Sequence, residues 1–394
     1  MPQKPVFSKP PLFSCVHSFL ASGMIRTDDR RIRQLYDYIC TYPDHYFLWE
    51  GLFRIACLIK KDPLSEPVTD LIKNAIEEKE DGSFDGTVSE QIAIARAAFS
   101  VYEYNTDRTI LNRLASCLRF IDNEFDLLSL QDGFLYRSAD LMEFLVRYYQ
   151  VTGLKAVLRI CSLLRAASFD WTSALHHFPH SVPIKNDPNS IFSVCQLEPP
   201  HMISYDDRKK VVNHAELLAD GTRFSLYSGI FSGNKQDLSA GYILWQYLSK
   251  HHHALCGGIT GDPFLCGKAS DKTVDNCALF AWTEALSSQM IQNDCTWATD
   301  ELIRIIFNGL DDYINHFKDC PEKQWVNLYK THENNIQNPI YLLGRLTRAV
   351  ACTYHHAVTI TSHGIKINYL IPCRIILSFQ DQPVILNMSY NNNR

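Results

Sequence analysis

The feature that most constrains the fold is a helical hairpin that recurs along the first two-thirds of the chain. Each copy has a helix with an aromatic end, a turn of Thr or Ser with Gly or Asp, and a second helix. In the second helix apolar residues recur every three or four positions, as between residues 111 and 118. This spacing places the apolar side chains on one helix face. The turns of three copies lie at residues 105–107, 151–153 and 232–234.

Hairpins of this kind bury their apolar faces only against neighbouring hairpins. With a repeat of about 45 residues, the chain holds roughly six of them, if further helices near residues 275–292 and 298–317 are included. We therefore expect a mainly α fold, an (α/α)6 toroid of helical hairpins, whose central pocket would bind a ligand. An open solenoid of the same hairpins is the alternative.

The C-terminal part changes character after Val358. The runs AVTITSHGIKINYLIP, CRIILSF and PVILNMS are rich in β-branched residues and are separated by turn residues. This pattern is typical of a small antiparallel sheet. The sequence thus predicts three parts: an N-terminal extension (1–30), the helical barrel (31–352), and a short β-rich segment (353–394) that begins a β-sandwich.

Charge, hydropathy and cysteine usage exclude some classes of protein and indicate the compartment. The formal charge of −5 provides no basic field for nucleic acid, and we find no run of about 20 apolar residues that would cross a membrane. The 13 cysteines are scattered, mostly within apolar helical runs, which favours buried thiols in a reducing compartment over a disulfide framework. We expect a cytoplasmic protein; the oligomeric state is left open.

The segment HHHALCGGITGDPFLCGKASDKTVDNC, residues 251–277, concentrates residues that carry chemistry. Cys256, Cys266 and Cys277 could converge on zinc, although structural zinc sites usually use closely spaced cysteine pairs. The histidines at its start are equally typical of a helix C-terminus. Its aspartates could supply the carboxyl groups that glycoside hydrolysis needs, or could be solvated turn residues. The segment predicts the rim of a pocket.

Several motifs together resemble one known family. HAELLADGTRFSLYSGIFSGNKQDLSAGYILWQYLSKHHHALCGGITGD and the following TVDNCALFAWTEAL, the upstream Phe-Asp-Trp-Thr at residues 169–172, and the downstream NPIYLLGRLTRAVACTYHH are similar to the β-L-arabinofuranosidases of glycoside hydrolase family 127. The resemblance covers about residues 45–380 and implies an (α/α)6 barrel. It also implies a retaining glycosidase with a zinc-bound cysteine thiolate as nucleophile and a glutamate as general acid/base.

The resemblance assigns roles to particular residues. Cys277 matches a family cysteine, and Asp275 stands where the family has a glutamate, so both are candidate zinc ligands. Pro263 occupies the position of the acid/base glutamate, which leaves Asp262 as the substitute acid beside Cys277 as the second catalytic candidate. The family's downstream cysteine pair, which contains the nucleophile, has no counterpart before the last helix.

Three further residues are candidates for substrate binding. His214 and His252 match family histidines, and Trp171 could stack on a sugar ring or belong to the core. We therefore expect a glycoside hydrolase acting on an arabinofuranoside or related sugar, with reduced activity because of Pro263. The alternatives are a catalytically degenerate barrel that binds a carbohydrate or a protein partner, and a helical scaffold without a pocket function.

Overall fold

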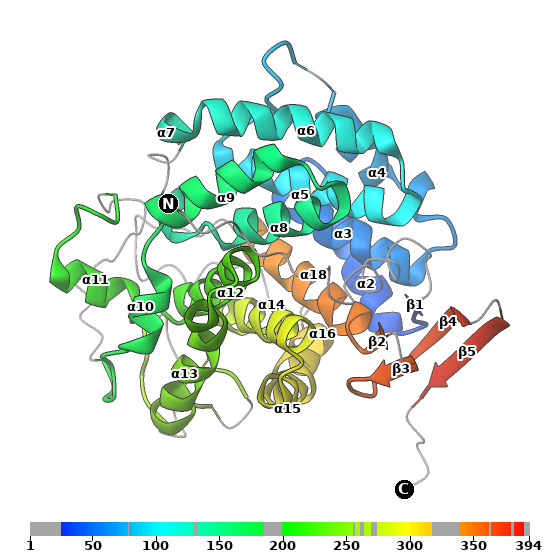
Figure 1. Cartoon of the computed structure of the whole chain (residues 1–394). Helices are drawn as coiled ribbons and strands as arrows, with labels where there is room; N and C mark the ends of the chain where they lie inside the picture. Colours follow the sequence, from blue (N-terminus) through cyan, green and yellow to red (C-terminus); the bar gives the residue numbers. More distant parts are fainter. Residues whose placement is uncertain are drawn as a thin grey trace, which may run out of the picture. The chain divides into compact units, whose positions relative to one another are not determined.

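The computed structural model describes residues 25–77, 79–128, 133–184, 199–254, 257–260, 264–268, 274–316, 339–361, 364–379 and 382–389. Helices predominate among them, and strands gather near the C-terminal end (Figure 1). The chain divides into two compact units. Of the described residues, unit 1 comprises those within 118–309, and unit 2 comprises those within 25–117, 310–316 and 339–389. This division cuts the predicted barrel segment 31–352, so the predicted domain bounds stay a prediction.

Unit 1 is built around three helices that are buried on nearly all sides, α8 (Ala139–Thr152), α12 (Ala215–Ser232) and α14 (Asn276–Asn293). Helix α12 packs against both α8 and α14. More amphipathic or shorter helices complete the unit: α7 (Phe125–Leu128), α9 (Lys155–Ala167), α10 (Trp171–His176), α11 (Tyr205–Val211), α13 (Lys235–His251) and α15 (Thr296–Ile305). Of these, α9 packs on α8, α10 and α13 on α12, and α15 on α14.

Unit 2 repeats this plan with α3 (Tyr46–Ile59), α5 (Val88–Asn105) and α18 (Pro339–His355). Helix α3 packs against both α5 and α18. The surrounding helices are α2 (Arg30–Ile39), α4 (Pro67–Ala75), α16 (Asp311–His316) and the first part of α6 (Arg108–Asn123), whose last part belongs to unit 1.

The helices α3 and α18 approach closely because glycines lie where they cross. A Cβ atom at Gly51 would overlap the side chain of Thr347, and one at Gly344 would overlap the carbonyl oxygen of Phe47. Glycine is needed at both positions, because any side chain would push the helices apart.

The predicted hairpin turns are confirmed. Helices α5, α8 and α12 each end in a residue with a left-handed backbone: Thr106 (φ 56°), Gly153 (φ 64°) and Gly233 (φ 71°). Glycine takes this conformation without strain, and the helix C-terminus is where it is most often required. The next helix of each pair, α6, α9 or α13, begins within two residues of that turn.

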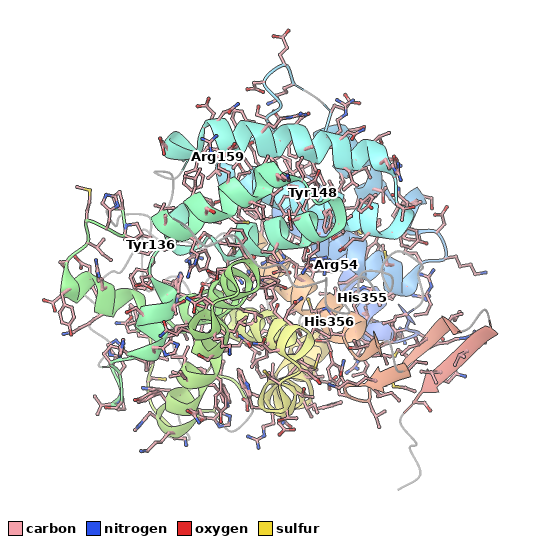
Figure 2. All side chains as sticks on the ribbon, in the orientation of Figure 1. Arg54, Tyr136, Tyr148, Arg159, His355 and His356 are labelled. Atoms are coloured by element: carbon pink, nitrogen blue, oxygen red, sulfur yellow. The ribbon has the colours of Figure 1, made fainter. Side chains whose placement is uncertain are left out.

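The interior of unit 2 contains charged side chains. The carboxylate of Glu50 on α3 forms ion pairs with three arginines: with Arg54 Nη2 at 2.9 Å, with Arg96 Nε at 2.8 Å and with Arg348 Nη1 at 4.0 Å. We call Glu50 and these three arginines the arginine cluster. His355, at the end of α18, contacts the carbonyl oxygen of Arg54 at 3.2 Å, and the two labelled side chains lie near each other in Figure 2.

The β-rich segment forms two small antiparallel sheets in unit 2. Strands β2 (Val358–Thr361) and β3 (Gly364–Ile367) make a hairpin, and β4 (Cys373–Phe379) pairs with β5 (Gln382–Met388). The sequence predicted these strands but not β1 (Ile25–Arg26), which pairs with β4. Two residues are too few for a periodic signal. Within the described ranges, no helix is both long enough and apolar enough to cross a membrane.

Candidate functional site

One face of α12 is polar although the helix is buried. Glu216, Asp220, Arg223 and Tyr227 are spaced by four, three and four residues, which places them on a single helix face. All four are at most 3% exposed. We call these four residues the polar face of α12.

Arg223 lies at the centre of this face and pairs with carboxylates from three helices. Its guanidinium contacts Asp140 and Glu143 on α8, with 3.5 Å to Glu143. It also contacts Glu284 on α14 at 3.3 Å and Asp220 on its own helix at 3.6 Å. We call these four carboxylates and Arg223 the carboxylate cluster. Bridging α8, α12 and α14, it holds the centre of unit 1 together through buried charge.

Two further arginines border the cluster. Arg147 Nη1 is 3.4 Å from Glu143, and Arg137 Nη1 is 3.4 Å from Glu216. The side chains of Asp140 and Arg137 are 24% and 27% exposed, whereas those of the other cluster carboxylates are 11% exposed or less. The cluster therefore reaches solvent at its Asp140 end, which is where a polar ligand could contact it.

The electrostatics of the cluster keep Arg223 charged. Burial alone would lower the pKa of the Arg223 guanidinium, but the neighbouring carboxylates, with Asp140 and Glu284 first among them, raise it well above its usual value. Burial, reinforced by Glu143, likewise raises the pKa of Tyr227. Tyr227 is therefore a neutral phenol beside an ionised guanidinium at physiological pH.

His214 precedes the polar face at the N-terminus of α12. Its ring is buried, and burial lowers its pKa to about 4, so it is neutral at pH 7. It forms a β-bridge with Phe264, whose ring meets the imidazole edge-on at 6.0 Å between centroids. The N–H of Leu265 donates to the carbonyl of Asn213 at 3.1 Å. The segment 264–268 is thereby fixed beside the start of α12.

His252 connects three segments. Its carbonyl accepts the N–H of Thr260 at 2.8 Å, and its Nδ1 accepts the N–H of Gly267 at 3.2 Å. Because Nδ1 accepts, Nε2 carries the proton in the neutral ring and donates to the carbonyl of His180 at 3.1 Å. Burial lowers the pKa of His252, which favours this neutral form. Both ring nitrogens thus contact the protein.

The candidate metal ligands lie at the start of α14. Asp275 is its N-cap, and its Oδ2 accepts the N–H of Ala278 at 2.9 Å. Cys277 is buried in the first turn. Within the ranges that the structure describes, no three His, Cys, Asp or Glu side chains are arranged to hold a metal ion. The zinc site stays a prediction, because Cys256 lies outside the described residues. Asp262 and Pro263 lie outside them.

Trp171 is part of the core of unit 1. It is 1% exposed and starts α10, where its ring packs against Phe169 at 4.7 Å between centroids. On its other side it lies so close to Gly221 on α12 that a Cβ there would overlap the indole. The ring fills the contact between α10 and α12.

Sequence reasoning missed the carboxylate cluster. The signal was present: charged residues recur at helical spacing inside otherwise apolar runs, as in ADLMEFLVRYY and AELLADGTRF. A charged residue in such a run is buried only when it is paired. Three of the four carboxylates that pair with Arg223 lie on other helices, so the run alone does not identify them.

Comparison with known proteins gives matches by structure alone. No protein-family model and no curated protein sequence matches the chain. A structure described as a glycoside hydrolase matches with a TM-score of 0.60 and 12% identity over 94% of this chain and 66% of that one. A GH127 β-L-arabinofuranosidase from Geobacillus stearothermophilus T6 matches with a TM-score of 0.57 and 12% identity over 95% and 65%.

A third structure, a GH127 β-arabinofuranosidase, matches with a TM-score of 0.57 and 10% identity over 96% of this chain and 68% of that one. The chain thus spans about two thirds of the length of these structures. They bear out the predicted fold class, an (α/α)6 toroid of helical hairpins followed by a short β-rich segment. The chain has a glycoside hydrolase family 127-like fold.

Proposed function

We propose that the chain hydrolyses an arabinofuranoside or a related glycoside. The observation that carries the proposal is the structural likeness to glycoside hydrolases over 94% or more of this chain. Because the likeness is one of fold, the sugar and the activity are inferred from the family resemblance and from the chemistry that the residues could perform.

The carboxylate cluster supports carbohydrate recognition. Ionised carboxylates accept hydrogen bonds from sugar hydroxyls, and guanidinium groups donate to them. A partly exposed group of each kind is present: Asp140 of the cluster, and Arg137, which pairs with Glu216 on the polar face of α12.

The catalytic roles come from the family resemblance. Asp262 would protonate the leaving group, since Pro263 has no proton to transfer, and Cys277 would act as the second catalytic group. A zinc ion at Asp275 and Cys277 would lower the thiol pKa. Metal analysis of the purified protein and of Cys277→Ser tests whether zinc is bound: the wild type should contain zinc and the variant should contain less.

Aryl glycosides with good and poor leaving groups test the proposal. General acid catalysis contributes about 10²- to 10⁴-fold, so Asp262→Asn should abolish turnover of an unactivated arabinofuranoside and spare an activated one. Cys277→Ala should lower both. Asp206→Asn, which changes an exposed aspartate, is the control. If the wild-type protein cleaves neither substrate, the proposed hydrolase activity is wrong.

The second candidate is a barrel that binds a carbohydrate without cleaving it. Pro263 at the acid position and the engagement of the cluster carboxylates with Arg223 favour this candidate. Calorimetric titration with free sugars would show binding without turnover, and Asp140→Asn should weaken it by about tenfold or more. A protein partner remains the further alternative if no sugar binds.

We also propose a cytoplasmic location. Burial raises the pKa of the thiols of Cys57 and Cys161 and raises that of Cys117 to about 12. These thiols are therefore protonated and unreactive at neutral pH, which fits a reducing compartment. Titration of the unfolded, non-reduced protein should then count close to all 13 cysteines as thiols.

A further inference from the structure

Four aromatic rings form a continuous series of contacts between α13 and α15 in unit 1. Trp245 stacks on Trp297 at 24°, with 5.8 Å between the ring centroids, and it also meets the fully buried Trp282 at 6.1 Å. Tyr242, one turn before Trp245 on α13, lies 5.9 Å from Trp297. Tyr242 is 45% exposed and Trp297 is half-buried. We call these two surface rings the aromatic shelf.

Neighbouring side chains hold the shelf in place. The indole N–H of Trp297 donates to the sulfur of Cys295, the N-cap of α15. Trp245, on which Trp297 stacks, meets the ring of His253 edge-on at 5.7 Å. The carboxylate of Glu301 binds His253 Nε2 in turn at 3.0 Å. Rings that are already fixed lose little conformational freedom when a ligand binds, so the shelf is a preorganised surface.

The exposed side of α13 carries no charge beside the shelf. Residues 238–249 include no Asp, Glu, Lys or Arg, and their exposed members are Tyr242, Gln246 and Tyr247. In α11, another peripheral helix of unit 1, five of the seven residues are charged. A helix that faces solvent usually carries charged residues on its exposed side. An uncharged exposed side with aromatic rings therefore indicates contact with a neutral ligand.

We infer that the aromatic shelf is a second carbohydrate-binding site, which holds a neutral chain of arabinofuranose units on α13 and α15. The C–H faces of sugar rings pack on aromatic rings. Gln246, one turn after Tyr242, supplies an amide that hydrogen-bonds sugar hydroxyls. A neutral sugar brings no charge that would need a partner at this surface. The kind of sugar rests on the proposed function, whereas the shelf shares no residue with the carboxylate cluster.

Affinity electrophoresis in gels that contain soluble arabinan, a neutral polymer of arabinofuranose, tests the inference. The wild type should be retarded, and Tyr242→Ala and Trp297→Ala should each raise the Kd for the polymer by about tenfold or more. Trp297→Phe keeps a ring and should retain most of the binding. The matched control is Tyr247→Ala, because Tyr247 is also 45% exposed but lies on another side of α13. This control should bind as the wild type does.

A second measurement separates the shelf from the site of hydrolysis. A small aryl arabinofuranoside occupies only the site of hydrolysis, so its kcat/KM should be unchanged in Tyr242→Ala and Trp297→Ala. If the wild type is retarded by arabinan but cleaves no glycoside, the proposed function is wrong and the shelf stands. If the wild type cleaves the aryl substrate but is not retarded, the inference is wrong and the proposed function stands.

Two further outcomes would overturn the inference. Retardation that survives both shelf substitutions would mean that another part of the surface binds the polymer. A wild-type dimer that Trp297→Ala converts to a monomer, measured by sedimentation equilibrium, would make the shelf an interface between copies of this chain. If circular dichroism shows that Trp297→Ala does not fold, Tyr242→Ala, which removes an exposed ring, decides the question with Tyr247→Ala as its control.

Discussion

The two units have the same plan of three buried helices but opposite charge patterns at their centres. In unit 1 one arginine, Arg223, is surrounded by four carboxylates. In unit 2 one glutamate, Glu50, is surrounded by three arginines. Carboxylates can accept protons when their surroundings demand it, whereas a guanidinium stays charged at every accessible pH. The same structural solution should therefore respond differently to pH in the two units.

The largest expected effect is that of Arg223→Met. It leaves the four carboxylates buried without their shared cation, and removing one partner of a buried ion pair typically costs about 3–5 kcal/mol. We expect the free energy of unfolding to fall by an amount near the upper end of this range at pH 8. At pH 5 the fall should be smaller, because buried carboxylates that are close together can bind protons at the lower pH. Urea denaturation at both pH values measures it.

The control is Arg159→Met, which changes an arginine that is 67% exposed in its ion pair with Asp122 and is labelled in Figure 2. It should cost less than about 1 kcal/mol at either pH. If the loss of unfolding free energy in Arg223→Met is the same at both pH values, the carboxylates are not the cause of the pH dependence.

A somewhat smaller effect is expected from Glu50→Gln. The amide keeps the shape of the glutamate, but three buried guanidinium groups lose their shared anion, at a cost of about 3–4 kcal/mol. Because arginine does not deprotonate, the loss should be the same at pH 5 and pH 8. Glu77→Gln, an exposed glutamate of the same unit, serves as control in the same denaturation series. A strong pH dependence of the loss would remove the contrast between the units.

The third prediction concerns a property that the units share. Burial lowers the pKa of His214 in unit 1 and of His355 in unit 2 to about 4, against about 6.5 in the unfolded chain. Between these values the unfolded state binds more protons, so stability is complete above pH 6.5 and falls as the pH decreases toward 4. At pH 4 the loss is about 3 kcal/mol per histidine.

Replacing either histidine by glutamine should flatten the decline in unfolding free energy between pH 6.5 and 4. The exposed His177, replaced in the same way, should leave the decline unchanged. If His214→Gln and His355→Gln reduce the decline in unfolding free energy by the same amount, this acid sensitivity does not depend on the surrounding charge pattern. If neither variant changes the slope, the acid sensitivity has another origin.

The sequence was sufficient for the helical hairpins and for strands β2 to β5, and insufficient for β1 and for the charged interior. Period-3.6 apolar stripes and turn residues such as Gly153 and Gly233 predict the hairpins, because both signals are local. Glu50 and Arg54, four residues apart, have the spacing of an ordinary surface pair. Their partners Arg96 and Arg348 are distant in sequence, so the run that contains Glu50 and Arg54 does not identify them.

The candidate site was predictable only in part. The family resemblance made His214 and His252 candidates for substrate binding, and the structure brings Phe264 to His214 and Gly267 to His252. The contacts of Glu301 with the N–H of Gly258 and with His253 could not be foreseen, since these partners lie 43 and 48 residues away in the chain. Asp262 lies outside the described residues, so its role stays a prediction.

The crossing of α3 and α18 has a consequence for how this sequence can change over evolution. Thr347 occupies the space that a side chain at Gly51 would need, so the two positions, far apart in the chain, share one small volume. A larger residue at Gly51 becomes tolerable only when Thr347 shrinks, and neither change is favourable alone. Among related chains the pair is therefore expected to covary, and divergence at this crossing should proceed through paired substitutions.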